Sequence, residues 1–171
     1  MKRKNISLII SCLILGIMAL AAIFCKQICP YDPNAQDLTS SFIPPFSQGH
    51  LLGTDNLGRD ILCRIIYGAR ISLFVGIVGT VIGFAVGVAL GIVSGYFGGI
   101  IDTVIMRVGD IQLAFPFTLL AIAIIAVLGA GVKNIIIVAV ITGWIKYARV
   151  VRSDVLAVKK MEYIQACKSL G

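Results

Sequence analysis

The chain has 171 residues, of which 58% are hydrophobic and only 13% are charged, whereas charged residues make up about a quarter of an average soluble domain. This composition excludes an ordinary water-soluble fold and indicates a membrane protein. The net charge of +7 does not indicate binding to nucleic acid, because the Lys and Arg residues lie near the ends of apolar segments and form no basic stripe with interleaved aromatic residues.

Residues 1–25 predict a first membrane-spanning helix. Three positively charged residues precede an uncharged run of twenty, residues 6–25, and about 20 residues are needed to span about 30 Å of hydrocarbon. A cleavable signal peptide is the alternative, because Ala19 and Ala21 fit the small-x-small cleavage pattern. We favour an uncleaved helix with its basic end in the cytoplasm.

Residues 26–70 predict an extracytoplasmic segment in two parts. Residues 26–50 hold four of the five prolines and show no periodicity, which indicates a loop. Residues 57–70, read as a helix, place their apolar side chains on one half of the helix surface, which predicts an amphipathic helix. Thr54 or Asp55 is expected to cap its start, and Asp60 is expected to pair with Arg64 four residues later. A surface helix with one packed face and a dedicated docking helix are both open interpretations.

Residues 71–101 are uncharged and must contain a second span. Glycine recurs there at every fourth position, at Gly79, Gly83, Gly87, Gly91 and Gly95. Such a series of GxxxG steps forms a groove that lets a neighbouring helix approach closely. Glycine is common in membrane helices in general, but steps linked in succession favour a helix-packing surface.

Two further spans are predicted, which gives four transmembrane helices with both termini in the cytoplasm. The charged segment 102–110 is expected in the cytoplasm, and residues 111–132 form an uncharged third span with Pro116 near its start, where helices tolerate proline. In the fourth span, Lys133 and Lys146 bracket only twelve residues, too few to cross alone. The helix is therefore expected to continue past Lys146, whose long side chain can reach the interface.

No pattern of catalytic or metal-binding residues is present. The chain has no GxxxxGK[ST] phosphate loop, and its single histidine, His50, has no second imidazole near it in the sequence to complete a metal site. The pairs Tyr31-Asp32 and Gly109-Asp110 suggest an intramembrane aspartyl protease only weakly, because Arg107 stands where a GxGD motif needs glycine. Five cysteines without a CxxC pair indicate no disulfide framework. The residues therefore predict no enzyme, no metal and no cofactor on this chain.

Residues 161–170 predict a short, charged helix with an apolar side. One interpretation is an interfacial helix on anionic lipid. The other is a coupling element that fits a groove on a soluble partner.

Three segments in order resemble the inner-membrane permease subunits of dipeptide, oligopeptide and nickel ABC importers, most closely the second subunit of the permease pair. They read "HLLGTDNLGRDILCRIIYGARISL", "SGYFGGIIDTVIMRVGDIQLAFP" and "GWIKYARVVRSDVLAVKKMEYIQACKSLG". The resemblance covers nearly the whole chain. The residues of the first segment that carry the family motif are Gly53, Thr54, Asp55, Gly58, Arg59 and Asp60.

The resemblance implies a set of partners and a coupling motif. Such a permease pairs with a sister permease, two cytoplasmic ATPase subunits that bind the ATP, and an extracytoplasmic substrate-binding protein. The EAA motif of the family, whose helix docks on the ATPase, matches Gln165, Ala166, Cys167 and Gly171. Gln replaces Glu and Cys replaces Ala here, which keeps a polar and a small side chain but removes a negative charge that could pair with the ATPase.

The resemblance also implies a fold and a size. Family members have six transmembrane helices, so an all-α chain with four of them, an amphipathic extracytoplasmic helix and a truncated cytoplasmic coupling helix is expected to be an N-terminal piece. Its expected parts are an N-terminal helix (1–25), an extracytoplasmic loop and amphipathic helix (26–70), and an incomplete permease core domain (71–171). The expected location is the cell membrane, with several passes. Peptide, nickel and glutathione importers share these motifs, so no substrate can be named. The alternative function is a small scaffold or regulatory membrane protein that acts through its GxxxG helix.

Overall fold

The computed structural model describes residues 2–170, and the elements within this range are helices, with isolated β-bridges in one loop. Contacts divide the chain into two compact units, Met1–Phe74 and Val75–Gly171. Each unit has its own small core and is described by itself.

The first unit contains an apolar helix, a short helix and a long loop. Helix α1 spans Lys2–Ile23 and α2 spans Cys25–Ile28, and the loop after them contains a 3-10 turn, η1, at Leu38–Ser40 and the isolated β-bridges. The segment Ile6–Ile23 of α1 has a mean hydropathy of 2.8 and is apolar on all sides, as expected for a helix surrounded by lipid. Cys25, Cys29, Cys63 and Ile66 form the core of this unit, and the three thiols serve there as small hydrophobic side chains.

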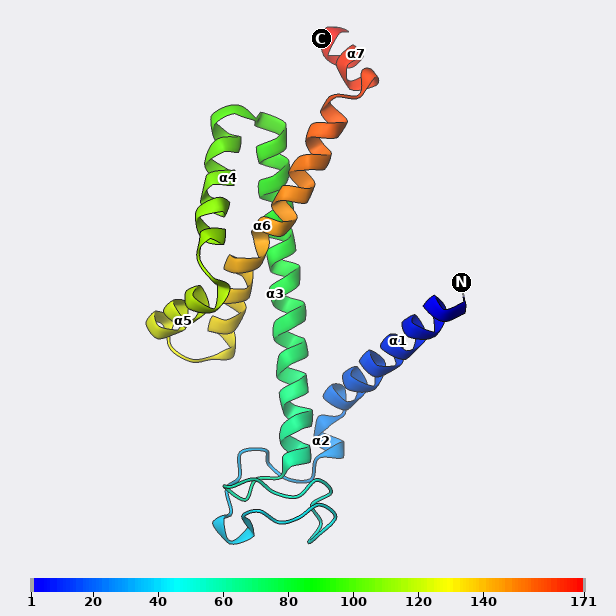
Figure 1. The fold of residues 1–171 in the computed structure, drawn as a ribbon, viewed down its shortest axis with the longest axis vertical. Helices are drawn as coiled ribbons and strands as arrows, with labels where there is room; N and C mark the ends of the chain where they lie inside the picture. Colours follow the sequence, from blue (N-terminus) through cyan, green and yellow to red (C-terminus); the bar gives the residue numbers. More distant parts are fainter. Residues whose placement is uncertain (1, 171) are drawn as a thin grey trace. The chain divides into compact units, whose positions relative to one another are not determined.

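Helix α3 spans Ile61–Phe97 without a break (Figure 1). The prediction of a separate amphipathic helix over 57–70 was therefore wrong, because residues 61–70 are the first turns of α3. The helix cannot begin earlier, since Gly58 has a φ of +71° and Asp60 accepts the backbone N–H of Cys63 at the helix start, in the manner of an N-cap. Asp60 therefore takes the capping role that was predicted for Thr54 or Asp55.

The second unit contains the rest of α3 and four further helices. These are α4 (Gly99–Ala114), α5 (Phe117–Leu128), α6 (Val132–Lys159) and α7 (Glu162–Leu170). Gly98 and Gly99 both have positive φ, of 66° and 54°, which allows the tight reversal between α3 and α4.

The predicted third span, 111–132, is not one helix, because it begins in the last turn of α4 and contains all of α5. Helices α4 and α5 meet at an angle of 94°, which Figure 1 shows as a sharp turn of the chain between them. Pro116 explains the break, because its ring disfavours helical backbone at the preceding residue, and Phe115 is extended with ψ of 133°. Within the described residues, three helices are long and apolar enough to cross a membrane, or up to four if the bent pair is one span.

The core of the second unit lies where α3, α4 and α6 meet. Trp144, Ile145 and Ala148 of α6 are buried there, and Leu90 of α3 and Ile105 and Met106 of α4 pack against them. Helix α6 continues past Lys146, as predicted, and ends at Lys159; after a turn at Lys160 and Met161, the chain enters α7.

Candidate functional site

The five glycines of the GxxxG series lie along the face of α3 that contacts α6. At Gly87, an added Cβ would lie 2.5 Å from the carbonyl oxygen of Trp144, and at Gly91 it would lie 2.7 Å from that of Ala148. Real Cβ atoms do not approach backbone oxygens this closely. The backbones of α3 and α6 are therefore in direct contact at these two positions, as in other helix pairs built on small residues.

The contact is uneven along the series. Gly79 and Gly95 leave no room for a methyl group beside Ala139 and Val155, whereas a Cβ at Gly83 would be 3.8 Å from the nearest atom of Val140, an ordinary van der Waals distance. The residue numbers that meet increase together along both helices, so α3 and α6 run parallel. Their C-terminal ends, and α7 after them, consequently lie at the same end of this unit.

Helix α4 packs on α6 in the opposite direction. Gly109 of α4 is buried against the side chain of Ile145, and the Trp144 Nε1 donates a hydrogen bond of 2.9 Å to the Gln112 side chain. Toward the other end of α4, Ile105 and Met106 contact the core residues of α6. Residues early in α4 thus meet residues late in α6.

Two ion pairs also join α4 to α6, and they differ in burial. Arg149 and Asp110 meet at 2.6 Å with both side chains about half exposed. Arg152 donates twice to Asp102, from Nε at 2.5 Å and from a terminal nitrogen at 2.6 Å, and the Asp102 side chain is 18% exposed. The second pair is the bidentate kind, which fixes orientation as well as distance.

The Asp102 carboxylate also receives a bond from α3. Ser94, which is fully buried, donates its hydroxyl to Asp102 at 2.5 Å. Asp102 lies in the first turn of α4, where a negative charge is favoured by the helix dipole. Lys159, at the end of α6, adds a second tie by donating to the carbonyl oxygens of Gly95 and Tyr96 at 3.2 and 2.7 Å.

Helix α7 carries the residues predicted to couple to an ATPase. Gln165, Ala166 and Cys167 are exposed, and the Gln165 amide donates to the carbonyl oxygen of Lys160 at 3.2 Å. Gly171, the fourth predicted coupling residue, lies outside the described residues. The half-buried Ile164 points the other way and helps line a largely apolar groove of about 460 Å³ between α3, α6 and α7.

The family-motif residues of the first unit hold the loop before α3 in one conformation. Gly53 and Gly58 have φ of +78° and +71°, and a Cβ at either would collide with backbone atoms of residues 43 and 37. Only glycine fits both requirements. Between them, the buried Thr54 hydroxyl accepts the N–H of Ile43 at 2.9 Å and donates to the carbonyl oxygen of Ser40.

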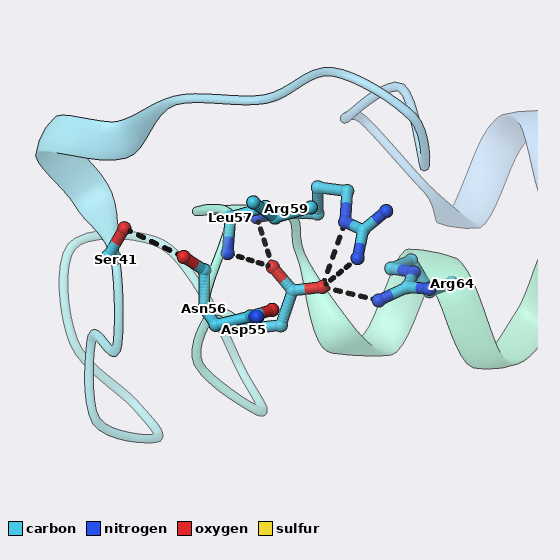
Figure 2. A network of polar contacts seen from close by, with 6 residues as sticks. All are labelled: Ser41, Asp55, Asn56, Leu57, Arg59 and Arg64. Atoms are coloured by element: carbon cyan, nitrogen blue, oxygen red, sulfur yellow. Dashed lines mark hydrogen bonds and ion pairs between the residues drawn. The ribbon is translucent and has the colours of Figure 1, made fainter.

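Asp55 is the centre of the loop's polar network (Figure 2). One carboxylate oxygen accepts the backbone N–H groups of Leu57 and Arg59, and the other accepts the side chains of Arg59 and Arg64. The Ser41 hydroxyl donates a hydrogen bond to the carbonyl oxygen of Asn56 in the same turn. Burial alone would raise the pKa of the Asp55 carboxyl, but the hydrogen bonds from Arg59 and Leu57 outweigh it and hold the pKa well below its usual range.

The predicted Asp60–Arg64 pair was wrong. Arg64 binds Asp55, and Asp60 instead lies 2.8 Å from the Nδ1 of His50 while capping α3 through Cys63. Asp60 is 4% exposed, and both of its carboxylate oxygens are used by these two contacts. The sequence contains no local signal for the His50 contact, because the loop has no periodicity. Among residues 2–170, no group of three or more His, Cys, Asp or Glu side chains is arranged to hold a metal ion.

Comparisons with known proteins match both ends of the chain to one kind of system. Residues 87–171 match the family described as the binding-protein-dependent transport system inner membrane component. Residues 3–45 match the N-terminal TM domain of oligopeptide transport permease C.

Individual relatives cover almost all of the chain. It is 41% identical over 169 residues to the oligopeptide transport system permease protein OppC of Bacillus subtilis, with 99% of this chain and 55% of the relative covered. It is 36% identical to the nickel transport system permease protein NikC of Escherichia coli K12 (93% and 57% covered), and 45% identical to the glutathione transport system permease protein GsiD of Shigella flexneri (91% and 51% covered). The chain thus spans about half the length of the curated relatives it matches.

Proposed function

Because this chain belongs to the family of binding-protein-dependent inner-membrane transport components, we propose that it acts as a membrane-spanning permease subunit of an ATP-binding-cassette importer. The solute is a peptide or a related small solute such as nickel, as the names of the relatives suggest. The relatives named above are all permease proteins, so nothing favours the scaffold alternative.

The observation that supports specific residues in this role is the position of α7. A short turn connects α6 to α7, and Gln165, Ala166 and Cys167 of α7 are exposed. A short helix that exposes small residues, with Ile164 half-buried at the groove beside α3 and α6, is suited to insertion into a groove of a partner. In this proposal α7 docks on a cytoplasmic ATPase subunit. The ATP belongs to that partner, and this chain binds no cofactor.

The remaining assembly follows from the same proposal. A sister permease subunit completes the path through the membrane, a second ATPase subunit serves the sister, and an extracytoplasmic binding protein delivers the solute. The basic residues at 2–4 place the N-terminus in the cytoplasm. The parallel course of α3 and α6 then puts their C-terminal ends and α7 in the cytoplasm too, with the loop 29–60 on the outer face.

The test is co-purification of the ATPase subunits with the tagged permease from membranes that hold the whole complex. Ala166→Asp places a charge in the proposed contact, and Ala157→Asp places the same charge on the exposed side of α6 as the matched control. A charge buried without a partner costs more than about 1.4 kcal/mol, which is tenfold in affinity. We expect at least a tenfold loss of ATPase with Ala166→Asp and less than a twofold change with the control. Equal recovery of ATPase with both variants would refute the docking role of α7.

A further inference from the structure

The packing of α3 on α6 is close and apolar along most of its length. Side chains of α6 lie against the glycine positions of α3, as Tyr147 does at Gly87 and Val155 at Gly95, and Leu90 of α3 packs on the buried core of α6. At Gly83 the contact is looser, since an added Cβ would be 3.8 Å from Val140. Polar contacts add to this packing at the C-terminal end of the interface, through Asp102 and through Lys159.

The larger set of these polar contacts is centred on Asp102. Its carboxylate is bound by Ser94 from α3 and by Arg152 from α6, while Asp102 itself begins α4. Hydrogen bonds between charged groups are short and directional, and a bidentate guanidinium resists rotation about the contact. Arg152 lies two turns before the end of α6 at Lys159. The contacts of Asp102 with Ser94 and Arg152 therefore lie close to the point where the chain continues from α6 into α7.

We propose that Asp102, bound by Ser94 and Arg152, is a positioning residue that joins α3, α4 and α6 into one rigid body behind α7. A displacement of α7 by a bound ATPase then moves the three helices together and does not simply bend the end of α6. The inference rests on the proposed function, because it names how motion at α7 reaches the membrane helices. The exposed pair Arg149–Asp110 joins the same two helices through one bond; among the described residues it forms no hydrogen bond or ion pair with α3, so it does not have this role.

The test measures whether α7 and α4 move as one body in the assembled complex. Spin labels are placed on Glu162→Cys of α7, outside the proposed docking residues, and on Thr103→Cys of α4, both of which are exposed. Cys12 is changed to serine and Cys167 to alanine, which keeps a small side chain in the proposed contact. The distance between the labels is measured by pulsed electron paramagnetic resonance, without nucleotide and after trapping with ATP and vanadate. No solute is needed, so the unidentified substrate does not enter the result.

In the otherwise unchanged complex, we expect the distance to shift by less than the roughly 2 Å of a helix displacement at an interface. Two variants weaken the junction: Asp102→Asn removes the negative charge, and Arg152→Lys keeps the positive charge but removes the bidentate geometry. With either variant, we expect the distance between the labels to shift by more than that value on nucleotide binding, or its distribution to be at least twice as wide. Asp110→Asn is the matched control and is expected to behave as the unchanged complex does.

Each outcome decides the question. A large nucleotide-dependent shift in the unchanged complex overturns the inference, and so does an unchanged distance in both Asp102→Asn and Arg152→Lys. If neither variant accumulates, the exchanged pair Asp102→Arg with Arg152→Asp is measured, and a shift under about 2 Å supports the inference whereas a larger one overturns it. Failure of the unchanged chain to bind any ATPase subunit is a different result, because it refutes the proposed function and leaves no nucleotide effect to read.

Discussion

Replacing Gly87 with alanine is expected to separate α3 from α6. The new methyl carbon would lie 2.5 Å from the carbonyl oxygen of Trp144 and 2.7 Å from the Cβ of Tyr147. A carbon atom contacts a carbonyl oxygen at about 3.3 Å or more, so the backbones must move apart by nearly 1 Å. Neither neighbour can rotate away, because one atom is backbone and the other is the first carbon of its side chain.

The magnitude follows from two opposing effects. Overpacking a close contact costs about 1–3 kcal/mol, and alanine recovers up to about 1 kcal/mol over glycine from its higher helix propensity. We therefore expect Gly87→Ala to lower the free energy of unfolding by about 1–2 kcal/mol. Gly76→Ala, which has no atom within 4 Å of the added Cβ, and Gly83→Ala, with its nearest atom at 3.8 Å, are expected to be neutral or slightly stabilising.

The assay is unfolding by SDS in mixed micelles, followed by the fluorescence of the protein's one tryptophan. Trp144 is 8% exposed and lies between α3 and α4, so its emission reports on this interface. If Gly87→Ala unfolds at the same SDS fraction as Gly76→Ala and Gly83→Ala, the direct backbone contact described above is wrong.

Three further predictions concern the first unit. Asp55→Asn leaves two arginines without their carboxylate partner, so we expect faster amide hydrogen exchange in the loop before α3. The increase should be larger still for Gly58→Ala, because the new Cβ would collide with the backbone of Asp37. Burial alone would raise the pKa of the Asp60 carboxyl, but hydrogen bonds hold it below its ordinary value of 3.8. The ionised Asp60 carboxylate therefore stabilises the loop fully above pH 3.8, and this stabilisation is lost as pH falls through the lowered pKa. Amide hydrogen exchange of the loop, corrected for its intrinsic pH dependence, should accordingly show no opening of the loop between pH 7 and 5. Finally, in permeabilised membranes stripped of ATPase subunits, a water-soluble maleimide should modify the exposed Cys167 but reach the buried Cys63 only after denaturation. Equal labelling of both thiols would contradict the burial of Cys63 at the start of α3.

Several parts of the fold could be predicted from local sequence because the bilayer imposes a local rule. A span must be apolar over a fixed length, so the first helix and the apolar segments of the later spans are visible as runs of uncharged residues. The short helix predicted at 161–170 is close to α7 at Glu162–Leu170, since its charges and turn residues are also local. The packing face of α3 could also be predicted, because residues spaced four apart lie on the same face of any α-helix.

The predictions that failed were those in which a residue's partner lies elsewhere. The helix was predicted to begin at residue 57, but α3 begins at Ile61. Asp60 contacts His50 and caps the helix through the N–H of Cys63, and it does not pair with Arg64. The bend at Pro116 was underestimated, because whether a proline only begins a helix or breaks a span depends on how the flanking helices pack.

Composition and spacing were enough to identify a membrane protein with helices at these apolar runs, and to identify the glycine series as a packing surface, but not the helix that packs on it. The folded arrangement was needed to show that α6 lies on that surface, that a methyl group fits at Gly83 but not at Gly87, and that Asp102 binds an arginine 50 residues away. The difference arises because solvation by lipid acts on each segment separately, whereas a contact between helices requires two surfaces that no single segment encodes.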